Sequence, residues 1–130
     1  MVWFAVRWPT FKTRVFARWA RKEGVTDRAL LVAVTEMESG LIDARLGGFL
    51  FKKRVALPGG GKSGGARTIV AGNFRDRWIF LYGFAKNERE NIDQKEERDL
   101  KRIAGAMLVL DRAALGQLLD SGNLLEVKDG

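Results

Sequence analysis

Three stretches in the middle of the chain predict β-strands: FLFKKRVAL at residues 49–57, ARTIVAGNF at residues 66–74 and WIFLYGFA at residues 78–85. The first stretch alternates with a period of two, which is typical of a β-strand with two different faces. The third is apolar on both faces and suits the centre of a sheet. With a loop at residues 58–65 and a tight turn at Arg75–Asp76, the three strands predict an antiparallel meander.

Helical patterns precede and follow the meander. Residues 14–23 and 27–39 place apolar residues at helical spacing, Thr26 caps the second of these helices, and the pair forms a helical hairpin. A short strand is expected before them at residues 10–13, because Pro9 belongs at the edge of a sheet or at a bulge.

After the meander, Asp93 and Glu96 form the two halves of a capping box that starts a third helix. A short helix is expected at residues 112–119, and residues 124–127 form either a last strand or a tail. The third helix is expected to bury Leu100, Ile103, Ala104, Met107 and Leu108. Helices gathered on one side of an antiparallel sheet give an α+β fold.

The composition limits the kinds of functional site that this chain can contain. The 130 residues suit one domain, 1–130, in which residues 1–9 are a candidate flexible extension. Cysteine and histidine are both absent, which excludes disulfides, thiolate metal sites and a histidine base. No metal or cofactor is expected. The longest apolar run, residues 78–85, is far shorter than the roughly 20 residues of a membrane-spanning helix, so a cytoplasmic protein without membrane contact is expected.

Positive charge is concentrated in the middle of the chain. The formal net charge is +7, and residues 45–89 hold ten basic and two acidic residues, a balance of +8. Dense negative charge is the natural complement, because cations that contact phosphates release counterions. From charge alone, a protein that binds nucleic acid and a soluble basic protein without such a partner are equally expected.

The glycine-rich loop at residues 59–65 contains Gly61-Lys62-Ser63. A phosphate-binding loop of the nucleotide-hydrolysing type needs a glycine where this chain has Ala56, and a helix where a strand is expected. The loop is therefore interpreted as a flexible hairpin connection, with a mobile basic loop in which Lys62 contacts an RNA backbone as the alternative.

Cations from all three strands are expected to meet at one end of the meander. Lys52 and Arg54 share a face of the first strand, Arg67 begins the second, and Lys86 ends the third. Lys53, a further candidate for RNA contact, falls on the opposite, apolar side with Phe49, Phe51, Val55 and Leu57, where it must extend its amine to solvent or lie at an edge. The alternative is an ordinary solvated sheet face.

Other side chains are weaker candidates for RNA contact. Tyr82, the only tyrosine, is assigned to the strand face of Trp78, Phe80 and Phe84, where it either packs in the core or serves in base stacking or proton transfer. The polar turn after the third strand adds Asn87 and Arg89. Three further cations form either a solvated helix face or a set of phosphate contacts: Arg18, Arg21 and Lys22.

Several blocks in order resemble the HigB-like branch of the RelE toxins, within the RelE/ParE superfamily, over residues 11–127. They are FARWARKEG at 16–24, MESGL at 37–41, Gly47-Gly48, KKRVA at 52–56, GKSGGART at 61–68 and GFAKNER at 83–89. The resemblance implies a microbial RNase-like fold, with the meander packed against an N-terminal helical hairpin and C-terminal helices. It also implies a toxin, neutralised by a cognate antitoxin, that cleaves mRNA, typically on the ribosome.

By the pattern of the family, basic residues on the meander carry the chemistry, which points to Lys52, Arg54, Arg67 and Lys86. Some RelE toxins also use a tyrosine near the C-terminus as proton acceptor, and this chain has none after Tyr82. The hypothesis is a metal-independent attack by the ribose 2′-hydroxyl on the adjacent phosphate. Arg54 and Arg67 hold the phosphate, and Lys52 and Lys86 handle protons, since crowding by cations favours the neutral form of a lysine.

Two other functions stay open: a ParE-like inhibitor of gyrase on the same scaffold, and an RNA-binding module without catalytic activity. The expected antitoxin is acidic and covers the basic face, and a helix-turn-helix protein is one candidate.

Overall fold

The computed structural model describes residues 7–57 and 61–129. Within them the elements follow in the order β1 (Thr10–Thr13), α1 (Arg14–Glu23), α2 (Asp27–Glu38), β2 (Ala44–Gly47), β3 (Leu50–Leu57), β4 (Gly61–Gly72), β5 (Trp78–Ala85), α3 (Gln94–Leu108), α4 (Arg112–Ser121) and β6 (Leu124–Glu126). The α+β class is confirmed.

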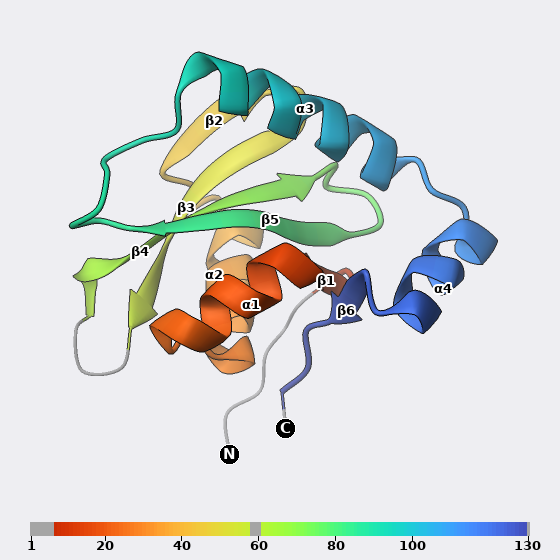
Figure 1. Cartoon of the computed structure of the whole chain (residues 1–130), viewed down its shortest axis with the longest axis horizontal. Helices are drawn as coiled ribbons and strands as arrows, with labels where there is room; N and C mark the ends of the chain where they lie inside the picture. Colours follow the sequence, from red (N-terminus) through yellow and green to blue (C-terminus); the bar gives the residue numbers. More distant parts are fainter. Residues whose placement is uncertain (1–6, 58–60, 130) are drawn as a thin grey trace.

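The strands form one sheet in the order β2-β3-β4-β5-β1-β6 (Figure 1). Strands β3, β4 and β5 pair antiparallel with their neighbours, which confirms the meander. Strand β1 then pairs parallel with β5, and β6 pairs antiparallel with β1. Because β5 has partners on both sides, it occupies an interior position, as its apolar sequence predicted.

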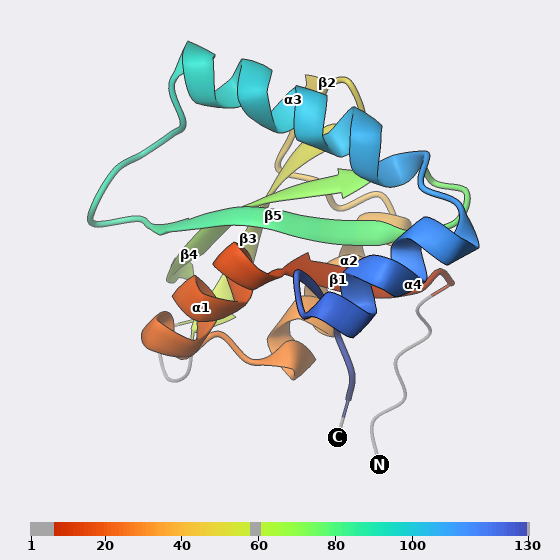
Figure 2. The ribbon, with the colours of Figure 1, turned by 45° about the vertical axis from the view of Figure 1, so that its right-hand side comes forward.

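Helices cover both faces of the sheet, and the expectation that they lie on one side is wrong. Figures 1 and 2 show α3 across one face and α1 and α2 against the other. One core joins α1 and α2 to inward residues such as Phe51 and Phe80. A second core joins α3 to Leu50 and Ile69. Both faces of the meander are apolar in part, so each binds a layer of helices.

The helix ends follow the sequence signals. The side chains of Thr13 and Thr26 accept hydrogen bonds from backbone amides in the first turns of α1 and α2. Gly24 ends α1 in the left-handed conformation, with φ of 77°. The reciprocal capping box between Asp93 and Glu96 is present at the start of α3.

Four local predictions are wrong. Phe49 lies in a turn with φ of 63° and is 57% exposed instead of facing the core. This turn connects β3 to the short strand β2, which the sequence did not reveal. Strand β4 begins at Gly61 and not at Ala66, and it ends at Gly72, before Phe74. Ile103 is 44% exposed on α3.

A β-bulge changes the facing of β5. Val70 pairs with Phe80 whereas Ile69 pairs with Tyr82, so Leu81 is the additional residue. Before the bulge, Phe80 packs in the core beneath α1 and α2; after it, Tyr82 packs against the core beneath α3. The expectation that Tyr82 shares the face of Trp78 and Phe80 is therefore wrong.

Residues 7–9 pack against the sheet, which contradicts a flexible extension for this part of 1–9. The amide of Arg7 donates to Glu38 Oε1 at 2.8 Å. The Trp8 ring lies 6.4 Å from that of Trp78, and the carbonyl of Pro9 accepts from the Trp78 amide at 3.0 Å. Residues 1–6 lie outside the described part of the chain.

Lys53 is a structural residue, and its prediction as an RNA contact is wrong. Alternation turns it to the face beneath α2, where its side chain is 5% exposed. Its Nζ donates to the carbonyl of Leu41 at 2.9 Å and lies 3.1 Å from Glu36 Oε1. The buried ammonium thus ties β3 to α2 and to the segment that follows α2.

We predict that Lys53→Ala lowers the free energy of unfolding by about 3 kcal/mol, because it leaves the Glu36 carboxylate without its lysine. The double variant Lys53→Met/Glu36→Leu should regain most of this loss, since it removes both charges. Denaturant unfolding measures both values. A Lys53→Ala variant as stable as the wild type would contradict the structural role.

Candidate functional site

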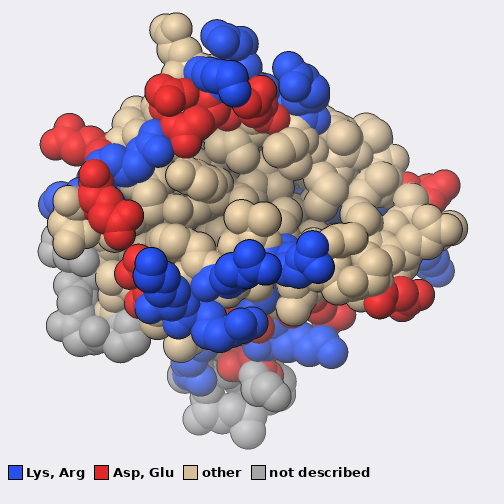
Figure 3. All heavy atoms as spheres, in the orientation of Figure 1, with Lys and Arg blue, Asp and Glu red and all other residues tan. Residues whose placement is uncertain are grey.

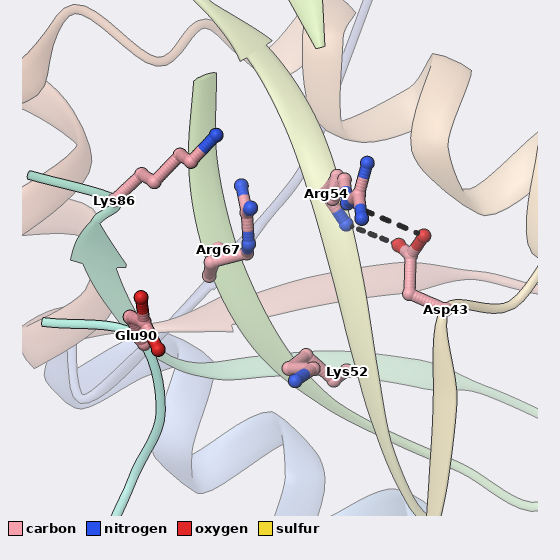
Figure 4. A pocket seen from close by; sticks show the side chains of 6 residues that line it. All are labelled: Asp43, Lys52, Arg54, Arg67, Lys86 and Glu90. Carbon is pink, nitrogen blue, oxygen red and sulfur yellow. Dashed lines mark hydrogen bonds and ion pairs between the residues drawn. The ribbon is translucent and has the colours of Figure 1, made fainter. Parts of the chain in front are cut away.

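The four predicted catalytic cations line one pocket of about 300 Å³ (Figure 4). Its walls are Asp43, Lys52, Arg54, Arg67, Lys86 and Glu90. The structure thus brings together, on one side of the meander, the cations that the sequence placed on three neighbouring strands. It adds two carboxylates that the sequence did not single out.

The register of the sheet puts these side chains together. Arg54 is paired directly with Arg67 across β3 and β4, and Arg67 with Phe84 across β4 and β5. Lys52 lies two residues from Arg54 and therefore points to the same face. Lys86 follows the last residue of β5 at the same end of the sheet. A shift of one residue in β3 would turn both of its cations to the other face.

The pairing of Arg54 with Arg67 places like charges opposite each other, which destabilises a sheet unless a counter-ion is near. Asp43 supplies part of that compensation. Its Oδ2 accepts from the Arg54 amide at 2.6 Å, and its Oδ1 lies 3.7 Å from Arg54 Nε. The remaining positive charge in the pocket is suited to an anionic ligand.

Arg67 provides the most specific sign of such a ligand. Its Nη1 is buried, and no residue in the described ranges accepts a hydrogen bond from it. A buried donor without an acceptor costs about 1–3 kcal/mol, and more when the group is charged. A phosphate oxygen in the pocket would remove that cost, because a guanidinium binds phosphate through two parallel hydrogen bonds.

Asp43 and Glu90 are the site residues that sequence reasoning missed. Asp43 immediately precedes β2, the strand that the sequence did not reveal. Glu90 lies in the polar segment between β5 and α3, in which the sequence indicated only Lys86, Asn87 and Arg89 as candidates. The run Lys86-Asn87-Glu88-Arg89-Glu90-Asn91 was the available signal, because its polar content exceeds what the cap at Asp93 requires.

Arg89, expected to contact RNA, is engaged inside the protein instead. Its guanidinium pairs with both oxygens of Glu96 and lies 5.5 Å from the centre of the Phe84 ring. Its Nε donates to the carbonyl of Asn91 at 2.9 Å. The hydrogen bond from Arg89 and the amide of Asp93 lower the pKa of Glu96, whereas Glu96 raises the pKa of Arg89. Arg89 thus fixes the segment after β5 against α3.

The other predicted RNA contacts lie around the pocket and not in its walls. Tyr82 is half-buried, with its ring 6.2 Å from that of Phe84, on the face that also carries Lys52 and Arg67. Asn87 is exposed on the turn after β5. The side chain of Lys62 lies outside the described part of the structure, so its role stays a prediction. Because β4 continues from Gly61, no helix follows the glycine-rich loop, as expected.

A second group of cations lies on α1, on the opposite side of the sheet from the pocket. Figure 3 shows Lys and Arg side chains gathered over this helix. Its exposed basic residues are Arg14, Arg18, Arg21 and Lys22. These residues form the solvated helix face that the sequence predicted. Their contribution to phosphate binding stays a prediction.

The described residues contain no group of three or more acidic residues placed to hold a metal ion. None of their helices combines the length and the apolar character needed to cross a membrane.

We predict that the ion pair of Glu96 makes stability depend on pH in the acid range. The pKa of Glu96 is lowered in the folded chain, so its contribution is complete above the ordinary pKa of the group and is lost as the pH falls through the lower folded value. Glu96→Gln should therefore destabilise the protein more at pH 7 than at about pH 3, as measured by denaturant unfolding. Glu97→Gln, which loses only a surface pair with Lys101 at 3.1 Å, should cost little at either pH. An equal loss for Glu96→Gln at both pH values would contradict the assignment.

Comparison with known proteins agrees with the architecture. No curated protein matches the chain. A family model described as the RelE toxin of the RelE/RelB toxin–antitoxin system matches residues 9–127. The match extends from β1 through β6 and includes every residue that lines the pocket. The chain therefore belongs to the RelE toxin family.

Proposed function

We propose that the chain is an endoribonuclease toxin that cleaves mRNA by attack of a ribose 2′-hydroxyl on the adjacent phosphate. The observation that carries the proposal is the convergence of Lys52, Arg54, Arg67 and Lys86 in one pocket, with a buried Arg67 nitrogen that lacks an acceptor among the described residues. Membership of the RelE family supports the role of toxin, and the pocket supplies a place for the reaction.

Arg54 and Arg67 hold the phosphate. They are directly paired across two strands, so two planar guanidinium groups face one region of the pocket. The transition state carries more negative charge on its phosphate oxygens than the substrate does. Rigid cations at that position stabilise the transition state more than the ground state, and this difference is what increases the rate.

Lys52 and Lys86 are assigned to proton handling. Cleavage requires a proton for the 5′-oxygen as its bond to phosphorus breaks, and an ammonium group can supply it. Both lysines line the same pocket as the two arginines, where an ammonium group is placed to act as the acid of the reaction. The products are a 2′,3′-cyclic phosphate and a 5′-hydroxyl.

The proposed partners are mRNA on the ribosome and a cognate antitoxin. An acidic antitoxin segment that covers the pocket would neutralise the cations and exclude substrate in one step. Tyr82 and Asn87 lie beside the pocket, where they are suited to contact nucleotides next to the cleaved bond. Tyr82 presents a half-exposed ring, and aromatic rings stack on bases without strong sequence preference.

We predict that Arg67→Ala lowers the rate of RNA cleavage about 10²–10³-fold, because it removes one preorganised donor to the developing charge. Arg75→Ala is the matched control, since Arg75 is exposed on the turn after β4, away from the pocket. Induction of each variant at equal expression, with mapping of mRNA ends, measures the effect. Arg67→Ala that arrests growth and cleaves mRNA as the wild type does would refute the assignment.

The same experiment separates the alternatives. DNA damage with intact mRNA would indicate a ParE-like inhibitor of gyrase. RNA binding without cleavage or growth arrest would indicate a binding module. Either result would contradict the proposed function.

We also predict that Arg54→Ala weakens RNA binding and lowers its dependence on salt. Removing one phosphate contact should reduce the slope of log K against log salt by about 0.7 for single-stranded RNA, whereas Arg75→Ala should leave it unchanged. Titrations at several salt concentrations measure the slope. An unchanged slope for Arg54→Ala would place the phosphate elsewhere.

A further inference from the structure

The proposed reaction needs a group that removes the proton of the 2′-hydroxyl, and the four cations of the pocket do not provide one while they are charged. The chain has no histidine, and no tyrosine lines the pocket. Among the described residues, the acceptors in its walls are the carboxylates of Asp43 and Glu90. A carboxylate is ionised at neutral pH and accepts a proton without prior activation.

Asp43 is already occupied on the Arg54 side of the pocket. One of its oxygens accepts from the Arg54 amide at 2.6 Å, and the other forms the ion pair with Arg54 Nε. Figure 4 shows both contacts as dashed lines. Because one oxygen holds the Arg54 amide and the other its guanidinium, the Asp43 carboxylate is poorly suited to approach a substrate hydroxyl. Asp43 is therefore a positioning residue for Arg54.

Glu90 lies on the other side, and its carboxylate makes no hydrogen bond or ion pair that the described residues reveal. In Figure 4, Arg67 lies between Arg54 and Glu90, and Glu90 is on the same side of Arg67 as Lys86. A ribose 2′-hydroxyl next to a phosphate held by Arg67 would therefore lie between the arginine and this carboxylate. The Glu90 side chain is exposed, so it can reach a substrate that enters from solvent.

The neighbours of Glu90 hold its backbone in place. Arg89 pairs with Glu96 of α3, and its Nε donates to the carbonyl of Asn91, so a hydrogen bond spans Glu90 itself. Ile92 is buried in the core beneath α3. Preorganisation of this kind is what a catalytic group needs, because a small displacement from the reacting atom costs much of the rate.

We infer that Glu90 is the general base of the proposed cleavage. Its carboxylate takes the proton from the 2′-hydroxyl, the 2′-oxygen forms a bond to phosphorus, and the bond from phosphorus to the 5′-oxygen breaks. A protonated lysine of the pocket, Lys52 or Lys86, gives its proton to the 5′-oxygen. Exchange with water then restores both groups. The inference rests on the proposed function and names a residue that neither the composition nor the strand pattern indicated.

The test is the pH dependence of single-turnover cleavage by the purified chain, on a short mRNA free and bound to ribosomes, with RNA affinity measured in parallel. Glu90→Gln should lower the rate about 10²–10³-fold without weakening RNA binding, because it removes a negative charge from a basic pocket. The wild type should lose rate as the pH falls through the range in which carboxyl groups are protonated, and Glu90→Gln should lack this loss. Glu90→Asp should retain the pH dependence at a reduced rate.

Glu88→Gln is the matched control, because Glu88 is an exposed glutamate of the same segment that does not line the pocket. It should cleave as the wild type does, and thermal unfolding should show all variants folded. Cleavage by Glu90→Gln within about threefold of the wild type, with the same pH dependence, would overturn the role of base while leaving the nuclease intact. A wild type that cleaves neither substrate would instead refute the proposed function, and the role of Glu90 with it.

Discussion

The site depends on the register between β3 and β4, which pairs Arg54 directly with Arg67. Two like charges in opposite positions weaken a sheet by an amount comparable to the gain from a favourable cross-strand pair. The apolar partners on either side keep the register in place: Leu50 opposite Ala71 and Val55 opposite Ala66 are all buried. Hydrophobic pairing thus compensates for the repulsion between the two arginines, and that pair of arginines is the basis of the proposed phosphate site.

The two helical layers have different consequences for this site. Helices α1 and α2 pack on the face opposite the pocket, where the buried pair of Lys53 with Glu36 joins β3 to α2. Helix α3 packs on the same face as the cations, and its first turn holds Arg89 through Glu96. The core beneath α1 and α2 therefore fixes the strands, and the cap of α3 fixes the segment that carries Lys86 and Glu90. Each half of the pocket is positioned by a separate set of contacts.

Alternation and capping signals made most of the fold predictable. The bounds of β1 and β5, the caps at Thr26 and Asp93, and the clustering of four cations follow from periods of 2 and 3.6 and from the direction of strands in a meander. The features that local patterns miss depend on tertiary pairing. Strand β2 has only four residues, too few for its alternation to be recognised. The bulge at Leu81 changes the facing of Tyr82, and parallel pairing of β1 with β5 joins segments far apart in sequence. Asp43 and Glu90 were missed for the same reason, since their positions follow from these contacts.

The chemistry of the RNA ends offers the most direct test of the account, because it reports which oxygen attacks the phosphate. Fragments produced from ribosome-bound mRNA by the purified chain would be analysed by mass spectrometry. Attack by the 2′-hydroxyl predicts a 2′,3′-cyclic phosphate on the upstream fragment and a 5′-hydroxyl on the downstream one, with no added metal ion. A 3′-hydroxyl together with a 5′-phosphate would show attack by water, and would contradict a pocket built from Arg54, Arg67 and their neighbours to activate the ribose.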